Sequence, residues 1–219
     1  MHNILIVTSV QAEREAVERG LKQSPGFHVL AGGVGAAASA ASTMAACLEA
    51  AARGIRYELI INAGIGGGFR EHAAIGDIVI ASEIVAADFG AESAEGFISV
   101  DELGFGSGRR QADERSARRW MELLRAADLH AVHAPVVTVT TATGTAATAG
   151  AIQARVANVA AEAMEGFGAA VAASQLQIPV LEVRAISNEV GPRNRDAWRI
   201  GEALKSLEAA CRLLPEVFA

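Results

Sequence analysis

The sequence contains little cysteine, few aromatic residues and no excess of positive charge. Its 219 residues include only two cysteines, Cys47 and Cys211, and both fall within apolar helical patterns. Such cysteines are typical of small core side chains, so we expect no disulfide and a reduced, cytoplasmic protein. The net charge is −6 at pH 7, so we expect neither nucleic acid nor a membrane surface as a partner.

Several sequence patterns are also missing. The first ten residues, MHNILIVTSV, include a short apolar run but no basic segment, so we expect no secretion signal. The longest apolar stretch, residues 34–52, is rich in Ala, Ser and Thr and contains Glu49, which predicts a buried helix and not a membrane span. The sequence has neither GxxxxGK[ST] nor GxSxG, which argues against a P-loop NTPase and against a serine hydrolase.

The composition and the order of the elements predict an α/β fold. With 51% hydrophobic and 20% charged residues, we expect one domain, residues 1–219, with a large core. Strands and helices alternate, which predicts a three-layer α/β/α domain with a central parallel or mixed β-sheet. We expect strands at 4–10, 27–31, 59–65, 77–87, 136–140, 158–163 and 180–186, and helices at 12–21, 34–52, 109–128, 146–156, 164–176 and 196–214.

Two connections depart from the alternation of strands and helices. Too few residues separate strands 59–65 and 77–87 for a crossover helix, so we expect these strands to form an antiparallel pair. Residues 88–108 are rich in glycine and aromatic residues and show no clear period, which predicts a long loop near a functional site.

The segment VLEVRAISNEVGPRNRDAW, residues 180–198, is the most informative stretch. An apolar strand changes at once into polar residues, among them Ser187 and Asn188, and Arg184 interrupts the apolar run itself. Polar groups beside a core strand are costly without partners, and the carboxyl ends of strands are where α/β sheets bind ligands. The alternative is that they only fix a loop. Asn194 or Asp196 is the expected N-cap of the last helix.

Two glycine-rich segments can bring backbone amides to a ligand. Residues 33–38, GVGAAA, loosely match a dinucleotide fingerprint, but no acidic residue ends the next strand, so we expect no nucleotide cofactor. The segment NAGIGGGF, residues 62–69, follows a buried strand. It predicts a flexible turn in which Ile65, Gly66 and Gly67 cradle a sugar, water or anion, or else a plain tight turn.

Polar groups at the ends of three predicted strands suggest one shared site. Glu13, Glu165 and Asn188 each follow or end a predicted strand. Each carboxylate alone is typical of a solvated surface, whereas an α/β sheet brings strand ends together. His130 and His133 lack cysteine or carboxylate companions, so we expect no metal site.

These segments resemble the nucleoside phosphorylase/nucleosidase superfamily over the whole chain. The resemblance rests on Glu13 after the first strand, GGVG, INAGIGGGF, GDIVIASEIVAADFGAE, TVTTATGTAAT, AEAMEG and RAISNEVGPRNRDAW. The last of these and residues 88–106 resemble the futalosine hydrolase branch. The resemblance implies hydrolysis of futalosine to hypoxanthine and dehypoxanthine futalosine, in the futalosine route of menaquinone biosynthesis, by a homo-oligomer without cofactor or metal.

The resemblance also implies roles for individual residues. Glu13 matches the carboxylate that activates the attacking water. Arg184 matches an arginine that helps to hold this carboxylate and the water. Met164 and Glu165 match a pair that packs under the ribose and binds its hydroxyls. Asn188 stands where methylthioadenosine nucleosidases carry an aspartate that protonates N7 of adenine.

The asparagine at this position favours a 6-oxopurine substrate. The amide of Asn188 can hydrogen-bond both N7 and a 6-oxo group, but it supplies no acidic proton. We further expect Ser187, Thr143 and Phe89, or Phe105 in the place of Phe89, to line the substrate pocket. No aromatic residue occurs at 143–145, where the family stacks the base, and the sequence assigns no cation to the carboxylated tail of futalosine.

The chemistry fits this assignment, and three alternatives remain. Glycosidic cleavage passes through an oxocarbenium-like state that needs a carboxylate, a positioned water and a donor to the leaving base. A purine nucleoside phosphorylase would need arginines for phosphate, and the glycine segment offers none before Arg70. Asn188 argues against a methylthioadenosine/adenosylhomocysteine nucleosidase. The joint presence of Glu13, Glu165 and Arg184 argues against a non-catalytic nucleoside-binding protein.

Overall fold

The runs richest in Ile and Val form the centre of the molecule. In the computed structural model, which describes residues 2–219, β1 (Ile4–Thr8), β3 (Leu59–Gly68), β4 (Ile78–Ala86) and β10 (Val180–Glu189) are mostly buried. Strands covered on both faces form continuous apolar runs because neither face meets water. The other strands are β2 (Phe27–Ala31), β5 (Gly90–Ser93), β6 (Gly96–Ser99), β7 (Arg109–Gln111), β8 (Ala131–Thr138) and β9 (Ala161–Ala163).

The main sheet is mixed and partly closed. Its strand order is β10-β4-β8-β9-β3-β1-β2, β7 pairs with β4, and β10 also pairs with β3. The strands β3, β10, β4, β8 and β9 therefore form a ring. Because β10 is parallel to β3 and antiparallel to β4, β3 and β4 run in opposite directions. The predicted antiparallel orientation of these two strands is thus confirmed, although they are not direct neighbours, since β10 lies between them.

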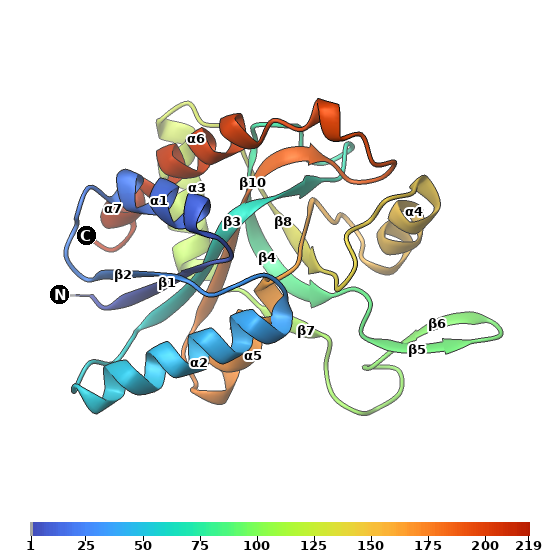
Figure 1. Ribbon diagram of the computed structural model, residues 1–219, viewed down its shortest axis with the longest axis horizontal. Coiled ribbons are helices and arrows are strands. Elements are labelled where there is room, and N and C mark those ends of the chain that lie inside the picture. The colour runs from blue at the N-terminus through green and yellow to red at the C-terminus, as the bar shows by residue number, and fades with distance from the viewer. Residues whose placement is uncertain (1) are drawn as a thin grey trace.

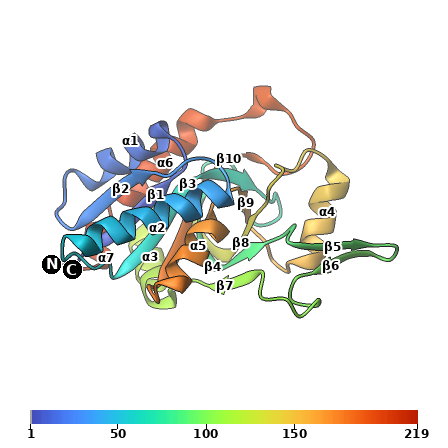
Figure 2. The same cartoon turned by 60° about the horizontal axis from the view of Figure 1, so that its bottom comes forward.

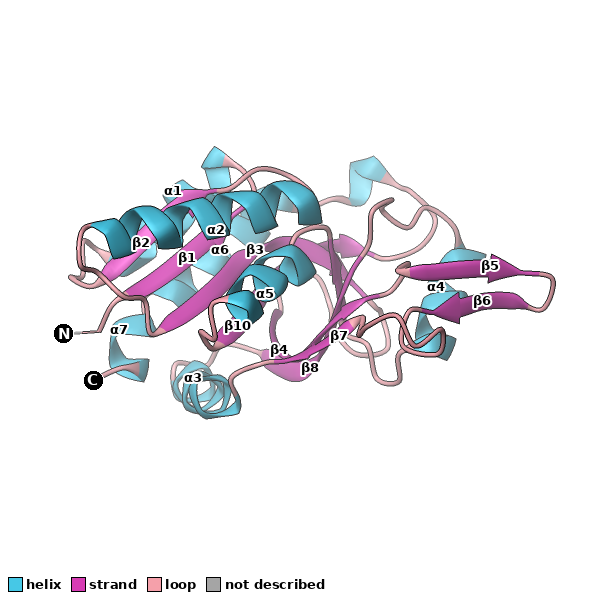
Figure 3. Cartoon of the chain, turned by 90° about the horizontal axis from the view of Figure 1, so that it is seen from below, coloured by secondary structure: helices cyan, strands magenta, loops and turns pink. Residues whose placement is uncertain are grey.

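Helices cover both faces of the sheet, which confirms the predicted three-layer arrangement (Figures 1 and 3). On one face α1, α3 and α6 pack around Ile6, Ile61 and Trp120, and on the other α2 and α5 pack around Val7 and Ile60. Among residues 2–219, none of the helices is long and apolar enough to cross a membrane. The helices are α1 (Gln11–Leu21), α2 (Ala36–Ala52), α3 (Glu114–Ala126), α4 (Ala146–Arg155), α5 (Gly166–Gln175), α6 (Ile200–Cys211) and α7 (Leu214–Val217).

The predicted core cysteines are confirmed, whereas the predicted cap of the last helix is wrong. Cys47 and Cys211 are both buried and free. In place of one helix over 196–214, a 3₁₀ turn at Arg195–Ala197 precedes α6 and α7. Neither Asn194 nor Asp196 caps α6, which begins at Ile200 without a side-chain cap.

Three further predictions fail where tertiary pairing outweighs local composition. The glycine segment after Ile65 is no turn: β3 continues to Gly68 because β10 and β9 pair with its two edges. Within 88–108, β5 and β6 form a hairpin that projects from the body (Figure 2). Residues 109–111 pair with β4 as β7 and do not join a helix.

Candidate functional site

A cavity of about 400 Å³ lies where β1, β3 and β10 end. Segments far apart in the sequence meet there because parallel strands end at the same edge of a sheet. Nine of the eleven residues selected from the sequence line this cavity: Glu13, Ile65, Gly66, Gly67, Thr143, Met164, Glu165, Ser187 and Asn188. The other two, Arg184 and Phe89, do not line it.

Glu13 stands in the first turn of α1 and its carboxylate is held by four donors. Oε2 accepts from the amide of Ser9 at 2.9 Å, from its hydroxyl at 2.5 Å and from the amide of Val10 at 3.3 Å. Oε1 accepts from the amide of Ile65 at 2.8 Å. These contacts tie the start of α1 to β3 and fix the orientation of a nearly buried carboxylate at the cavity wall.

Gly64 explains why a glycine interrupts the apolar part of β3. A Cβ at this position would lie 2.6 Å from Glu13 Oε1 and 2.7 Å from Arg184 Nη1. Atoms at these separations overlap, so any side chain would displace both charged groups. The missing side chain thus leaves room for the carboxylate and the guanidinium on the same face of the strand.

Arg184 is buried beneath the cavity among acidic and amide groups. Its Nε and Nη2 lie 2.8 Å from Glu182 Oε1, Nη2 also donates to Asn62 Oδ1, and Nη1 is 3.4 Å from Glu165 Oε2. Burial alone would lower the pKa of Arg184, but the charges of Glu182, Glu165 and Glu13 raise it overall. The guanidinium therefore stays charged and orients the carboxylates around it.

Glu182 is a site residue that the sequence analysis did not select. It is fully buried, and within the described chain its Oε2 has no hydrogen-bond partner. Burial raises the pKa of Glu182, and the charge of Arg184 opposes that rise. Residues two apart on a strand share a face, so the pair Glu182–Arg184 in an apolar run was the available signal.

Glu165 connects the start of α5 to the glycine turn before α2. Its Oε1 accepts from the amide of Gly35 at 3.2 Å, and its Oε2 accepts from the amide of Met164 at 3.3 Å. Gly33 and Gly35 both have a φ of +92°, a conformation that favours glycine. The GGVG turn therefore serves to direct a backbone amide at Glu165.

The amide of Asn188 has a fixed orientation at the end of β10. Its Oδ1 lies 2.8 Å from Ser187 Oγ, and its Nδ2 donates to the carbonyl of Glu189 at 3.0 Å. Ser187 Oγ is also 3.1 Å from the carbonyl of Gly66 on β3. A primary amide has two N–H groups, so one N–H of Asn188 remains for a ligand.

Glu162 is a second acidic residue that the sequence analysis did not select. It lines the cavity, and its Oε1 and Oε2 accept from the amide of Thr143 at 2.8 Å and from its hydroxyl at 2.5 Å. Burial raises the pKa of Glu162, while the two bonds from Thr143 act in the opposite direction. Glu162 and Glu165 lie in the same motif, AEAMEG, and only Glu165 was selected from it.

The aromatic residue at the cavity is Trp198, not Phe89 or Phe105. Phe89 is half-exposed and packs against Phe167 with ring centroids 6.3 Å apart, and Phe105 is 84% exposed. Trp198 lines the cavity together with Arg193, whose guanidinium carbon lies 5.4 Å from the ring centroid. The expectation for Phe89 fails because the hairpin β5–β6 carries this part of the chain away from the strand ends.

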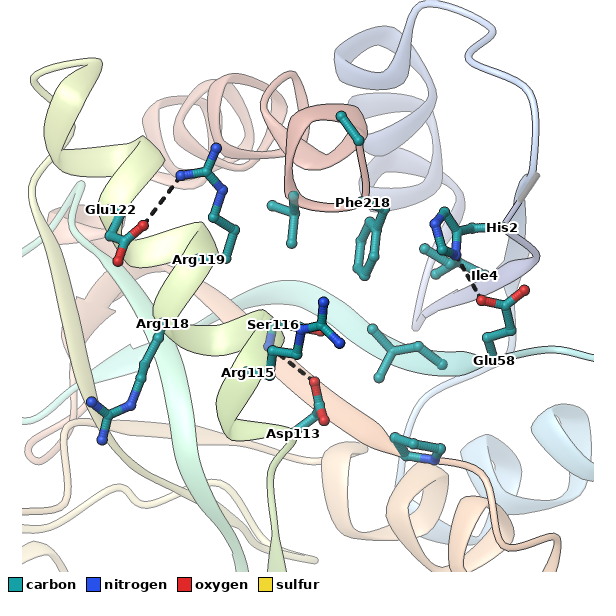
Figure 4. A pocket seen from close by; sticks show the side chains of 14 residues that line it. His2, Ile4, Glu58, Asp113, Arg115, Ser116, Arg118, Arg119, Glu122 and Phe218 are labelled. Atoms are coloured by element: carbon teal, nitrogen blue, oxygen red, sulfur yellow. Dashed lines mark hydrogen bonds and ion pairs between the residues drawn. The ribbon is translucent and has the colours of Figure 1, made fainter.

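A larger cavity of about 630 Å³ lies at the opposite ends of the same strands (Figure 4). Two pairs of its charged groups are bound to each other: Arg119 pairs with Glu122 at 3.2 Å and His2 with Glu58 at 2.7 Å. Asp113 caps α3 there. Throughout residues 2–219, no group of three His, Cys, Asp or Glu side chains is placed to hold a metal ion.

Comparison with known proteins finds relatives that agree on one superfamily. The family model described as phosphorylase superfamily matches residues 9–218. A futalosine hydrolase from Streptomyces coelicolor is 46% identical, covering 98% of this chain and 96% of the relative. One from Acidothermus cellulolyticus is 40% identical, covering 94% and 87%. The native structure of futalosine hydrolase from Helicobacter pylori, 13% identical, superposes with a TM-score of 0.82, covering 98% of this chain and 97% of the other, which shows a shared fold.

Proposed function

Since this chain belongs to the phosphorylase superfamily and, within it, to the futalosine hydrolases, we propose that it hydrolyses the N-glycosidic bond of futalosine. The products are hypoxanthine and dehypoxanthine futalosine. The observation that carries this proposal is the cavity in which the anchored carboxylate of Glu13 and the anchored amide of Asn188 both face a nucleoside-sized space.

Glu13 is the general base for the attacking water in this proposal. The four donors hold its carboxylate in place, yet each carboxylate oxygen has two lone pairs, so Oε1 can still accept from a water. Arg184, close to Glu13 at Gly64, orients the carboxylates from beneath the cavity. A base and a water held in one geometry save most of the entropic cost of bringing them together.

Asn188 assists the departure of the base. As the glycosidic bond breaks, electrons flow into the purine, and the free N–H of Asn188 can donate to N7 while negative charge develops there. The fixed amide needs no reorientation during the step, because Ser187 already holds its oxygen.

In this proposal the ribose lies between Glu13 and Asn188. Met164 and Glu165 line the cavity after β9, and Glu165 accepts two backbone N–H bonds on its inner side. Its remaining lone pairs accept from ribose hydroxyls, and its charge stabilises the oxocarbenium-like state. The carboxylated aromatic tail of futalosine then lies toward Trp198 and Arg193, which provide a ring face and a cation at the cavity.

Phosphorolysis is the competing reaction, and the charges at the cavity disfavour it. Within the described residues the lining includes Glu13, Glu162, Glu165 and Glu189 but only one basic side chain, Arg193. A phosphate dianion among four carboxylates would be repelled, whereas water would not.

Product analysis tests the proposal. The protein is incubated with futalosine, inosine or methylthioadenosine, each with and without phosphate, and the released bases are quantified. We expect hypoxanthine release from futalosine that does not depend on phosphate. A requirement for phosphate would identify a phosphorylase, and release of adenine from methylthioadenosine would identify a nucleosidase of the other branch.

We also propose that the enzyme works as a homo-oligomer in the cytoplasm. The resemblance to the family supports the homo-oligomer, and so do two large apolar side chains that are each 57% exposed: Val34 in the turn before α2 and Leu48 in α2 itself. Light scattering coupled to size-exclusion chromatography gives the oligomeric state directly.

A further inference from the structure

Three residues from adjacent strands form a row that crosses the cavity. In the sheet register Asn188 of β10 is paired with Gly67 of β3, and Gly67 is paired with Glu162 of β9. Residues directly opposite one another in neighbouring strands project to the same face, and all three of these residues line the cavity. The amide of Asn188 and the carboxylate of Glu162 are therefore presented side by side on one face.

The middle of this row is empty because its residue is a glycine. A Cβ at Gly67 would lie 2.8 Å from Val190 Cγ2 and 3.3 Å from Asn188 Nδ2, so it would press on the amide. The two outer strands are two strand spacings apart, about 10 Å between Cα atoms. Two polar side chains that reach inward from such positions leave a gap that suits the edge of a planar heterocycle.

The two polar groups differ in what they can bind. The amide of Asn188 both donates and accepts, whereas an ionised carboxylate only accepts. Along its N7, O6 and N1 edge a 6-oxopurine offers two acceptors and then a donor, the N1–H. A 6-aminopurine offers the opposite at its last two positions: an amino donor and a bare N1 lone pair.

We propose that Glu162 accepts a hydrogen bond from N1–H of a 6-oxopurine and, with Asn188, selects hypoxanthine over adenine. This inference rests on the proposed function, since it assigns the base side of the same cavity. A bare N1 in front of the carboxylate would leave two lone pairs facing each other. Sites built to hydrogen-bond one substrate group reject the analogue that lacks it strongly, because buried groups are then left unpaired.

Thr143 prepares the carboxylate for this role. It donates one bond to each carboxylate oxygen, through its amide and its hydroxyl, so the plane of the carboxylate is fixed before a ligand arrives. Each oxygen still has a second lone pair for the N1–H. Glu162 is thus a specificity-determining residue, and Thr143 is a positioning residue that acts through it.

The test measures the binding of free bases, so it does not depend on turnover. Dissociation constants for hypoxanthine and adenine are measured by calorimetry for the wild type and for Glu162→Gln, which keeps the shape of the side chain. Glu92→Gln is the matched control, since it removes a carboxylate from the exposed strand β5. We expect the wild type and the control to prefer hypoxanthine by at least about tenfold. In Glu162→Gln the preference falls by about tenfold or more, because the amide can turn and donate to N1 of adenine.

A further variant separates base recognition from support of the loop. Thr143→Val removes the hydroxyl donor but leaves the carboxylate and its bond from the Thr143 amide, so it should lower the ratio by less than Glu162→Gln does. An unchanged ratio of hypoxanthine to adenine affinity in Glu162→Gln would overturn the inference. A fall of this ratio in Thr143→Val as large as that in Glu162→Gln would also overturn it. Failure of the wild type to hydrolyse futalosine would overturn the proposed function instead, and the ratio of base affinities would still be measurable.

Discussion

Asn188 is the residue at which the choice of leaving group can be changed with least disturbance. An aspartic acid in this position can donate a proton to N7, which a 6-aminopurine needs more than a 6-oxopurine does. We expect Asn188→Asp to shift the ratio of kcat/KM values from futalosine toward its 6-amino analogue by about tenfold, comparable to the loss or gain of one hydrogen bond to a charged group. Steady-state kinetics with both nucleosides gives the ratio. If the ratio stays the same, Asn188 does not interact with the base.

Single residues were predictable when they stood at the ends of strands. Glu13, Glu165 and Asn188 were selected because parallel strands bring their ends together, and all three line one cavity. Glu162 and Glu182 lie inside strands, where the sequence alone does not reveal which face meets a cavity or a buried arginine. Their selection required the register of β9 and the contacts of Arg184.

At the scale of an element, α5 depends on the glycine with which it begins. A Cβ at Gly166 would lie 2.0 Å from Glu182 Oε2. Since that carboxylate is buried and bound to Arg184, it has little freedom to move. We expect Gly166→Ala to lower the free energy of unfolding by about 1–3 kcal/mol, the usual range for overpacking, as measured by urea denaturation.

The control for this prediction is Gly150→Ala in α4. Gly150 is exposed and a Cβ there would meet nothing within 4 Å. Alanine favours a helix interior over glycine by about 1 kcal/mol, so this variant should be as stable as the wild type or more stable. Equal stability losses in the two variants would show that the contact with Glu182 is not the cause.

Elements were predictable where hydrophobic periodicity is clear. The predicted boundaries were wrong where pairing with other strands decides them. Strands 27–31 and 180–186 were recognised from their apolar runs. The extension of β3 through its glycines depends on β9 and β10, which come much later in the chain. The strand β7 formed where a helix pattern was expected, because its edge pairs with β4 and Arg109 binds Glu83 at 2.6 Å.

At the scale of the whole molecule, the buried charge cluster should make stability depend on pH. Burial raises the pKa of Glu182 in the folded protein above the ordinary carboxyl value of 4.5 that applies after unfolding. The folded state then binds the proton more tightly than the unfolded state. This contribution to stability is complete below pH 4.5 and is lost as the pH rises through the raised pKa.

The variant Glu182→Gln isolates this contribution. Glutamine does not titrate, so any fixed cost of the substitution is the same at every pH. We expect the free energy of unfolding of the variant, relative to the wild type, to increase as the pH rises from acidic to neutral. Urea denaturation across this range gives the difference, and a constant difference would show that Glu182 does not titrate as described.

The overall architecture was predictable from alternating elements, but the closure of the sheet was not. Strands in alternation with helices predicted three layers. The position of β10 between β3 and β4 places the last strand of the chain at the centre of the sheet. Nothing local marks that position, although it is what brings Arg184 and Asn188 into contact with the glycines of β3.

The most direct test of the account compares the wild type with Glu13→Gln on futalosine in phosphate-free buffer. Glutamine keeps the shape of the side chain but cannot take a proton from water. We expect the wild type to release hypoxanthine and the variant to lose about a hundredfold or more in kcat, as for removal of a general base, with hypoxanthine affinity kept within a few-fold. Wild-type rates in the variant, or no release by the wild type until phosphate is added, would contradict the account.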